Sequence, residues 1–486
     1  MINCIPYQYL DVESSKKVLS WRNHEGVRMW MKNSAKITYP EHEEFVNSLK
    51  NRKDSLYYLV YEDGEAIGTI NLTRRDKETA EGGLLKNPDI SNKVGQQLIE
   101  CLEREAVKNG YNSIILEVQE QNNRAVQLYE KMGYQNIKSS EEYAVYKKNN
   151  IRLTIVVAEL SANHSKDIDI AKKSIHEAAI SGADAVKIQT YTADTLTIDS
   201  DNKYFKINQG TLWDGRTLYD LYKEAYTPWE WHEELRDLAE SLGMLFFSTP
   251  FDKSAVDFLE QKRVPLYKIA SFEITDIPLI EYTASKGKPM IISTGIADAG
   301  DIQLAVDACR KVGNKDITLL QCTSSYPAPV EEANLRMIPS LAETFGVKSG
   351  LSDHTMGSAV SVAAVALGAS MIEKHFILDR SMGGPDAAFS MEPEEFKRMV
   401  DDIRTVEKAL GNVDYSLTAR KKKSRKFSRS LFAVEDIPAG STITERNVRS
   451  IRPGDGMHPK YLSEILGKTA AKDIKRAHPI DFSSIS

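Results

Sequence analysis

Short apolar segments alternate with helical patterns through the middle of this chain, and this alternation constrains the fold more than any other feature. The helical patterns, such as that of residues 229–242, repeat apolar side chains every three or four positions. The apolar segments are eight in number and span residues 154–160, 185–190, 244–249, 266–271, 289–294, 317–323, 348–354 and 371–376. Eight strand–helix repeats over about 250 residues are typical of a TIM barrel. An open, doubly wound sheet is the alternative.

Two shifts in composition divide the chain of 486 residues. We predict domains at residues 1–149, 150–418 and 425–486, because a chain of this length holds about three domains. The second shift is the basic run 420–426, which we interpret as a flexible, solvated linker rather than a binding patch. The prediction is therefore an α/β multidomain protein.

The two flanking parts differ in character. In the first part, strand patterns flank Asp63-Gly64, the strongest short-range signal for a β-hairpin, and a helical pattern at 123–132 ends at Gly133. The third part has only short β-prone segments, such as 430–434. A part of about 60 residues holds little core, so we expect it to pack on something else.

Composition excludes several classes of protein. The 63 basic residues are mixed with 69 acidic ones and the net charge is -6, so a nucleic-acid partner is not expected. The longest apolar run, 359–372, is too short to cross a membrane. The N-terminus lacks the pattern of a signal peptide. Four scattered cysteines argue against disulfides and structural zinc and favour the cytoplasm.

Polar side chains follow all eight predicted strands. They are Glu159; Lys187 and Gln189; Ser248 and Thr249; Lys268 and Ser271; Ser293 and Thr294; residues 323–326; Asp353 and His354; and Lys374 and His375. Because catalytic groups of TIM barrels lie at the carboxyl ends of the strands, we expect the active site there. One such group could simply meet solvent, but eight on one face favour a site.

The chemistry of this set suggests a reaction. Lysines with hydroxyl groups bind phosphate and carboxylate. His354 and His375, on neighbouring strands, could share a divalent ion that keeps open positions for substrate and acts as a Lewis acid; the alternative is a structural role. The pattern therefore predicts a phosphorylated acid and a carbonyl that needs polarising.

The motifs at these strand ends resemble those of the sialic acid synthase family, in order. They are AELSANH (158–164), GADAVKIQTYT (182–192), FFSTPF (246–251), YKIASFE (267–273), STGI (293–296), CTSSYP (322–327), GLSDH (350–354), EKHF (373–376) and GPD (384–386). DIPAG (436–440) and IRPGDG (451–456) resemble the family's small antifreeze-like (SAF) domain. ELSANH and residues 210–219 are similar to the pseudaminic acid synthase branch.

The resemblance implies condensation of phosphoenolpyruvate with the open-chain aldehyde of an acetamido sugar, 2,4-diacetamido-2,4,6-trideoxy-L-altrose in this branch, with release of phosphate. It implies that His354 and His375 hold Mn²⁺ or Mg²⁺ and that Glu159 orients water or a metal-bound oxygen near the reacting carbons. Phosphoenolpyruvate would be held by Lys187, Thr249, Lys268, Ser271, Ser293 and Ser352. The sugar would face Gln189, Tyr326 and Asp386. Arg452 would reach a sugar acyl group of the partner subunit in a domain-swapped homodimer.

The first part resembles the GNAT acetyltransferases. The resemblance rests on residues 122–134, NNRAVQLYEKMGY, and Trp21-Arg22-Asn23 and Trp30-Met31 are similar to the subset that N-acetylates a UDP-linked 4-amino sugar of the pseudaminate pathway. It implies that backbone N–H groups bind the acetyl-CoA pyrophosphate. The implied cofactor-binding residues are Ser91, Asn92, Lys93, Val94, Gly95 and Asn122. Lys93 stands where these proteins usually have a glycine. Tyr129 is the implied general acid; the alternative is a packing tyrosine.

Three hypotheses follow for the whole chain. The first is a bifunctional enzyme, an N-acetyltransferase fused to a pseudaminic acid synthase. In the second, the first part is a sensing or interaction module without turnover, as the departure at Lys93 suggests. The third is a synthase for another nonulosonate, such as legionaminate or N-acetylneuraminate.

Overall fold

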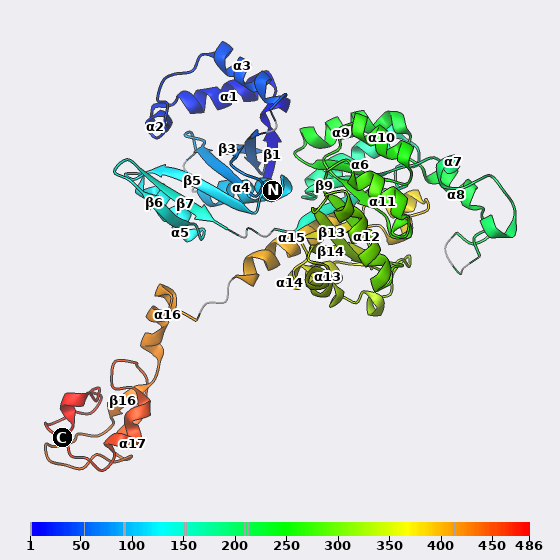
Figure 1. The fold of residues 1–486 in the computed structure, drawn as a ribbon. Helices are drawn as coiled ribbons and strands as arrows, with labels where there is room; N and C mark the ends of the chain where they lie inside the picture. The colour runs from blue at the N-terminus through cyan, green and yellow to red at the C-terminus, as the bar shows by residue number, and fades with distance from the viewer. Residues whose placement is uncertain are drawn as a thin grey trace. The chain divides into compact units, whose positions relative to one another are not determined.

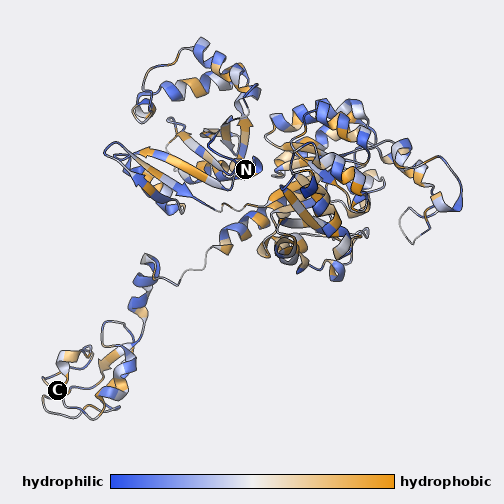
Figure 2. Ribbon diagram, viewed as in Figure 1, coloured by the Kyte–Doolittle hydropathy of each residue, from blue (hydrophilic) through white to orange (hydrophobic). Residues whose placement is uncertain are grey.

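The computed structural model describes residues 2–52, 54–90, 94–149, 151, 153–208, 210, 213–411 and 415–486. These residues form two compact units, Met1–Leu410 and Gly411–Ser486, each of which is described by itself. The first unit contains a seven-stranded sheet, formed by the start of the chain, and a closed barrel of eight strands (Figure 1). Figure 2 shows the hydrophobic residues gathered on the strands of the barrel and the sheet.

The N-terminal sheet has the strand order β1-β2-β3-β4-β5-β7-β6. Its strands are β1 (Ile2–Pro6), β2 (Ser55–Glu62), β3 (Glu65–Arg74), β4 (Thr79–Lys86), β5 (Ser113–Gln119), β6 (Gln135–Ser139) and β7 (Tyr143–Lys148). The hairpin between β2 and β3 turns at Gly64, whose φ of 83° favours glycine. β4 and β5 are parallel and pair only from Thr79 and Ser113 to Gly82 and Leu116, so their carboxyl ends diverge.

Five α-helices accompany this sheet in the described part of the chain. They are α1 (Val12–Asn23), α2 (Glu25–Arg28), α3 (Tyr39–Leu49), α4 (Gly95–Lys108) and α5 (Asn123–Lys131). α4 buries Leu98, Leu102 and Ala106 on one face, and these residues join the sheet core. These residues therefore form the face of α4 that packs on the sheet.

The barrel closes in the strand order β8 to β15, with every neighbouring pair parallel. The strands are β8 (Ile155–Glu159), β9 (Ala185–Thr190), β10 (Leu245–Pro250), β11 (Tyr267–Ile269), β12 (Met290–Ser293), β13 (Ile317–Cys322), β14 (Lys348–Asp353) and β15 (Met371–His375). The predicted TIM barrel is confirmed, and the open sheet is excluded because β15 pairs with β8.

Helices follow the strands around the barrel. They are α6 (Ile168–Ile180), α9 (His232–Ser241), α10 (Lys253–Gln261), α11 (Ile277–Ala284), α12 (Ala299–Lys311), α13 (Met337–Phe345), α14 (Ala359–Ala366) and α15 (Pro393–Leu410). The connection from β9 to α9 is a longer excursion that carries α7 (Ala193–Leu196) and α8 (Leu218–Ala225). This excursion contains residues 210–219, whose sequence distinguishes one branch of the resembled family from the others.

The second unit contains α16 (Ala419–Ser424), β16 (Ser430–Ala433), β17 (Val448–Ile451) and α17 (Leu462–Ile465). The expectation of little core is wrong, because this unit has a core of its own, formed by Leu431, Ala433, Ile437, Ile443, Val448, Met457, Ile465, Ala470, Ile474 and Ile480. That the unit packs on something else stays a prediction. The basic run is exposed but helical, because Thr418 caps α16 and lysine and arginine favour helix.

Candidate active sites

A cluster of buried charges occupies the barrel. The Lys187 ammonium lies 2.5 Å from a carboxylate oxygen of Glu159 and 3.4 Å from Glu373 Oε1. Lys268 Nζ lies 3.6 Å from the same Glu373 oxygen. None of these four side chains is more than 5% exposed. Lys187 also donates to Thr249 Oγ1 at 3.3 Å. The two lysines predicted to bind an anion therefore converge, with one carboxylate between them.

The two carboxylates of this cluster differ in protonation. Burial raises the pKa of Glu159 to about 7, even though Lys187 opposes this shift. Burial also acts to raise the pKa of Glu373, but Lys187 and Lys268 bring it down to about 2. Two carboxyl groups whose environments separate their pKa values are the usual arrangement for acid–base chemistry near neutral pH. Glu159 is therefore the group of this pair that can exchange a proton.

The other predicted hydroxyl groups are buried in the barrel and make different contacts. Ser352 donates to Glu373 Oε1 at 3.0 Å, and Ser271 Oγ accepts from the Gly295 N–H at 3.2 Å. A Cβ on Gly295 would lie 2.2 Å from Ser324 Oγ and 2.8 Å from Ser271 Oγ, so a larger residue here would displace both hydroxyls. Ser293 Oγ is buried and has no hydrogen-bond partner among the described residues. A buried hydroxyl without a partner is an open position for a ligand oxygen.

The two predicted metal ligands are adjacent. The rings of His354 and His375 lie 5.3 Å apart between centroids. His354 Nδ1 lies 3.0 Å from the Thr323 carbonyl oxygen, to which it can only donate, so its Nε2 is left as the lone-pair nitrogen. Burial lowers the pKa of His375 well below its usual value, and its buried Nδ1 has no hydrogen-bond partner in the described part of the chain. Two adjacent imidazoles, each with one ring nitrogen free of a protein partner among the described residues, fit a divalent ion.

No group of three or more His, Cys, Asp or Glu residues that could hold a metal occurs among the described residues. The two histidines would therefore leave most coordination positions to water or substrate, which is typical of catalytic rather than structural sites.

Aromatic side chains extend outward from the histidines. The Tyr326 ring lies 4.6 Å from that of His354, and the Trp213 ring, from the α7–α8 connection, lies 5.7 Å from Tyr326. Trp213 Nε1 donates to the Pro385 carbonyl oxygen at 3.2 Å. Aromatic faces of this kind suit the C–H and methyl groups of a deoxy sugar. Tyr326 and Trp213 therefore form a wall beside the histidines.

The other residues predicted to face the sugar meet at the segment after β8. Gln189 Nε2 donates to Ser161 Oγ at 3.0 Å, and Asp386 Oδ2 accepts from the Ala162 N–H at 3.3 Å. Burial raises the pKa of Asp386. The structure therefore brings Gln189 and Asp386 to one segment, as expected for residues of one site.

Sequence reasoning missed three residues and misplaced two. Glu373 and Trp213 are described above, and Cys322 Sγ lies 3.8 Å from His354 Nδ1. Glu373 could have been found, because residues two apart on a strand face the same side and it precedes His375 by two. Lys374 and Asp353 instead pair with each other at 2.9 Å, on the other side of the strands.

Of the residues predicted to bind acetyl-CoA or act as acid in the N-terminal domain, Val94, Gly95, Asn122 and Tyr129 lie in the described part of the chain. Gly95 begins α4 and Val94 precedes it. Asn122 caps α5 by accepting from the Ala125 N–H at 3.2 Å. Tyr129 is 7% exposed, and burial raises its pKa to about 12, which keeps its phenol protonated. Ser91, Asn92 and Lys93 lie outside the described residues.

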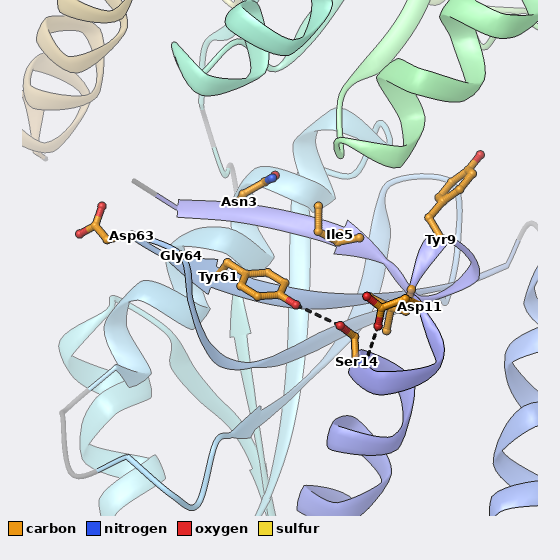
Figure 3. A pocket seen from close by; sticks show the side chains of 9 residues that line it. Asn3, Ile5, Tyr9, Asp11, Ser14, Tyr61, Asp63 and Gly64 are labelled. Carbon is orange, nitrogen blue, oxygen red and sulfur yellow. Dashed lines mark hydrogen bonds between the residues drawn. The ribbon is translucent and has the colours of Figure 1, made fainter.

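A hollow of about 470 Å³ beside β1 is lined by residues such as Tyr9, Asp11 and Tyr61 (Figure 3). None of the residues predicted for either site lines it. Arg452 is exposed directly after β17 in the second unit. In the described part of the chain, no helix is long and apolar enough to span a bilayer.

Three protein families match successive parts of the chain. The acetyltransferase (GNAT) family matches residues 24–134, the NeuB family residues 174–415 and the SAF domain residues 428–486. Pseudaminic acid synthase from Helicobacter pylori is 50% identical over 331 residues, which are 68% of this chain and 97% of the relative. The Campylobacter jejuni (serotype O:2) enzyme of the same name is 47% identical over 67% of this chain and 95% of its own.

The chain belongs to the NeuB family. A crystal structure of N-acetylneuraminic acid (sialic acid) synthetase from Leptospira borgpetersenii, with 31% identity, covers 60% of this chain and 95% of its own with a TM-score of 0.51. This NeuB-family chain is an enzyme that combines a synthase barrel with a GNAT domain before it and a SAF domain after it. The resemblance stated from the motifs is confirmed.

Proposed function

We propose that the barrel condenses phosphoenolpyruvate with the open-chain aldehyde of 2,4-diacetamido-2,4,6-trideoxy-L-altrose and releases phosphate. The observation that carries this proposal is the convergence of Lys187 and Lys268 on Glu373, which lies two residues before His375 on β15, while the His375 ring neighbours that of His354. Two buried ammonium groups suit a substrate with both a carboxylate and a phosphate. The histidine pair suits a carbonyl that must be polarised.

The residues of the chain divide the work as follows. Lys187, Lys268 and the neighbouring hydroxyls hold the carboxylate and phosphate of phosphoenolpyruvate. Ser293 Oγ, which has no hydrogen-bond partner among the described residues, is available to bind one of their oxygens. C3 of phosphoenolpyruvate attacks the aldehyde carbon. Water adds to C2 and gives one proton to Glu159, which passes it to the oxygen of the former aldehyde. The new C2 hydroxyl then gives its proton to the departing phosphate as the C–O bond breaks, which leaves a ketone at C2. A pKa of about 7 allows Glu159 to accept that proton and return it.

A divalent metal ion, Mn²⁺ or Mg²⁺, held by His354 and His375 would act as a Lewis acid toward the sugar carbonyl. The neutral state of His375 and the Nδ1–H of His354 prepare these rings for that role.

The choice of sugar rests on the relatives and on the aromatic wall. Pseudaminic acid synthases are 47–50% identical to this chain, whereas the N,N'-diacetyllegionaminic acid synthase of Campylobacter jejuni is 38% identical. Trp213 and Tyr326 offer apolar faces to acetyl methyl groups and to C6 of a 6-deoxy sugar. A synthase for legionaminate or N-acetylneuraminate is the alternative.

One experiment separates these substrates. Phosphate release from phosphoenolpyruvate is measured with a panel of 2,4-diacetamido and 2-acetamido sugars of defined stereochemistry. We expect turnover to be fastest with the altrose derivative. Faster release with a legionaminate or N-acetylneuraminate precursor would replace the proposed substrate.

For the N-terminal domain we propose transfer of an acetyl group from acetyl-CoA to the UDP-linked 4-amino sugar of the same pathway. The match to the GNAT family and the protonated, buried Tyr129 support this role. Tyr129 would give its proton to the departing thiolate, and the backbone of residues 91–95 would bind the pyrophosphate, with Asn122 nearby. Because the acetylated sugar is still linked to the nucleotide, a separate hydrolase must free it before condensation.

The alternative for this domain is a sensing or interaction module, since Lys93 replaces a usual glycine. Calorimetry of the full chain with acetyl-CoA, together with acetyl transfer by Tyr129→Phe, distinguishes the two. We expect the variant to bind acetyl-CoA normally and to transfer more slowly, by about 10²-fold or more. Absence of binding by the wild type would favour the module.

The SAF domain would complete the synthase site of a partner subunit through Arg452, in a domain-swapped homodimer. Arg452 is exposed, and its guanidinium suits an acyl oxygen of the sugar.

A further inference from the structure

The amino-terminal end of the barrel is covered by α4 of the N-terminal domain. Val107 packs against a barrel cluster that contains Ile155, Ala185 and Met371, the first residues of β8, β9 and β15. The same Val107 also packs against the core of the N-terminal sheet. One side chain of α4 therefore joins two hydrophobic cores.

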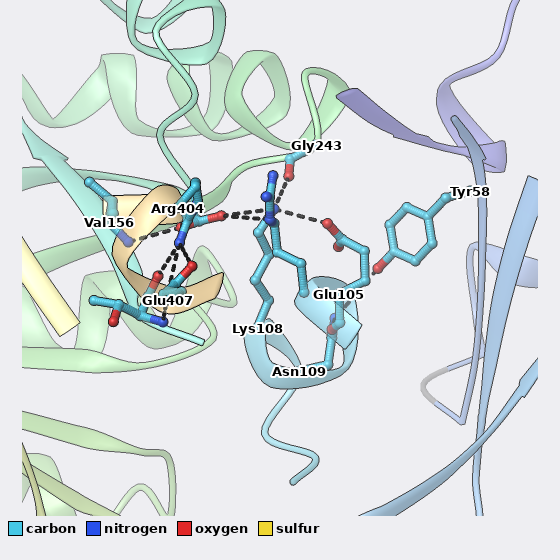
Figure 4. A network of polar contacts seen from close by, with 11 residues as sticks. Tyr58, Glu105, Lys108, Asn109, Val156, Gly243, Arg404 and Glu407 are labelled. Atoms are coloured by element: carbon cyan, nitrogen blue, oxygen red, sulfur yellow. Dashed lines mark hydrogen bonds and ion pairs between the residues drawn. The ribbon is translucent and has the colours of Figure 1, made fainter. Parts of the chain in front are cut away.

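A network of polar contacts joins the end of α4 to the barrel (Figure 4). Lys108, next to Val107, has a side chain that is 7% exposed, and its Nζ donates to Glu105 Oε1 at 2.9 Å and to the Gly243 carbonyl at 3.1 Å. It also lies 3.9 Å from Asp184 Oδ1. Asp184 is the residue before β9 and pairs with Arg404 of α15. The ammonium of α4 thus completes an ion cluster that belongs to the barrel.

A close backbone approach lies beside the cluster. Gly243, in the turn from α9 to β10, has φ of 78°, and a Cβ on it would lie 2.1 Å from the Cys4 carbonyl oxygen of β1. At the rim, the Tyr9 hydroxyl donates to Glu240 Oε2 at 2.7 Å. Contacts from two elements of the N-terminal domain therefore reach the same end of the barrel.

The connection between the domains is short. Ile151 still belongs to the N-terminal domain, because it is buried in the sheet core and its N–H donates to the Asn112 carbonyl at 2.8 Å. Thr154 already belongs to the barrel, since its hydroxyl donates to the Ala369 carbonyl at 3.0 Å. Only two residues lie between Ile151 and Thr154, and two extended residues span at most about 7 Å. This short connection leaves the two domains little freedom to separate.

We propose that the N-terminal domain has a second, structural function: it closes the amino-terminal end of the barrel through Val107 and Lys108 and stabilises the synthase. This function is independent of acetyl transfer. The residues of the proposed synthase site lie at the carboxyl ends of the strands. The end of the barrel that α4 covers is therefore opposite the synthase site.

The test uses the full chain with a specific protease site inserted between residues 152 and 153. After cleavage, we expect the two halves to elute together in gel filtration and to melt as the uncut protein does. Separate elution at micromolar concentration, with an unchanged melting temperature of the barrel half, would overturn the proposal.

Two variants and a matched control sharpen this test. Val107→Asp places a charge on the hydrophobic contact, and Lys108→Met removes the buried ammonium while keeping side-chain length. We expect each variant to weaken association of the cleaved halves by about tenfold or more. Lys108→Met takes a partner from a buried ion cluster, and Val107→Asp adds a charge to a hydrophobic core. Lys408→Met is the control: Lys408 pairs with Glu100 of α4 at 3.2 Å but is 66% exposed, so we expect less than about threefold.

An acetyltransferase variant separates the structural role from the proposed catalytic one. Tyr129→Phe should leave association and melting unchanged, whether or not the domain transfers acetyl groups. Loss of association in Lys108→Met to the same small extent as in Lys408→Met would count against the ion cluster and contradict the proposal.

Discussion

Glu373 accepts a hydrogen bond from Ser352 at 3.0 Å through the same oxygen that faces Lys187 and Lys268. This carboxylate is therefore the shared counter-ion of the two lysines in the substrate-free barrel. An arriving anion must compete with it or complete the shell around the ammonium groups.

Glu373→Gln keeps the shape of the side chain and removes its charge. Two buried ammonium groups would then have lost their shared partner, and we expect the free energy of unfolding to fall by about 3 kcal/mol. Added inorganic phosphate should restore part of this loss, since it replaces the missing negative charge. Thermal melting with and without phosphate measures both effects. An equal phosphate response in wild type and variant would contradict this interpretation.

Glu159 predicts the pH dependence of the synthase. Its pKa in the folded protein is raised from 4.5 to about 7 by burial, so the charged base is lost as pH falls through about 7. We expect kcat/KM for phosphoenolpyruvate to fall on the acid side with that midpoint. Glu159→Gln should lower the rate by about 10²-fold or more and abolish this limb. The profile is measured by phosphate release from pH 5.5 to pH 9.

The same group also affects stability. A carboxyl whose folded pKa is raised is favoured in its protonated form, so its contribution to stability is complete below pH 4.5 and is lost as pH rises through about 7. Glu159→Gln should remove this loss. The variant should therefore gain in melting temperature relative to wild type between pH 5 and pH 8. A constant difference across that range would mean that Glu159 keeps one charge state.

The histidine pair predicts a metal requirement. EDTA should abolish condensation, and Mn²⁺ should restore it. His354→Ala or His375→Ala removes one of two protein ligands and should cost orders of magnitude in rate, with the fold intact by circular dichroism. Metal content of the purified variants, measured by mass spectrometry, gives a readout separate from activity. Full activity in chelator would exclude the metal.

Trp213 predicts a split between the two substrates. Trp213→Ala removes the outer face of the aromatic wall, and loss of one aromatic contact is worth about 1 kcal/mol. We therefore expect KM for the sugar to rise about fivefold while KM for phosphoenolpyruvate is unchanged. Trp213→Phe, which keeps a ring, should lie closer to wild type. An equal change in both KM values would mean that Trp213 supports the fold rather than the sugar.

The barrel was predictable from sequence, but several contacts were not. Strands such as β9 and β13 are buried on both faces, so their apolar runs are unambiguous. The core of the second unit depends on long-range pairs such as Phe432 with Pro479, which no local pattern indicates. Lys374 and His375 both follow the same apolar run in the sequence. Because neighbouring residues of a strand point to opposite faces, only one of them can reach the site, and the run itself does not tell which.

The contact between α4 and the barrel was also out of reach of the sequence. Val107 and Lys108 end an ordinary amphipathic helix, where an apolar residue beside a lysine usually marks the edge of a solvated face. Asp184 precedes a strand and looks like a residue of a turn. Their proximity arises only when the two domains are placed together.

Arg452 predicts that a synthase site is shared between subunits. It lies exposed after β17 in a unit with its own core, so the unit can act as a separate body that reaches a neighbouring barrel. Arg452→Ala and His354→Ala each inactivate a different component of such a composite site. A heterodimer of the two variants would contain one site with both components intact.

Mixing the inactive chains should therefore restore phosphate release, up to about half of wild type for each heterodimer. Mixing Arg452→Ala with itself is the control. If subunit exchange is verified by mass and no activity returns, each Arg452 serves its own chain, and the domain-swapped dimer is excluded.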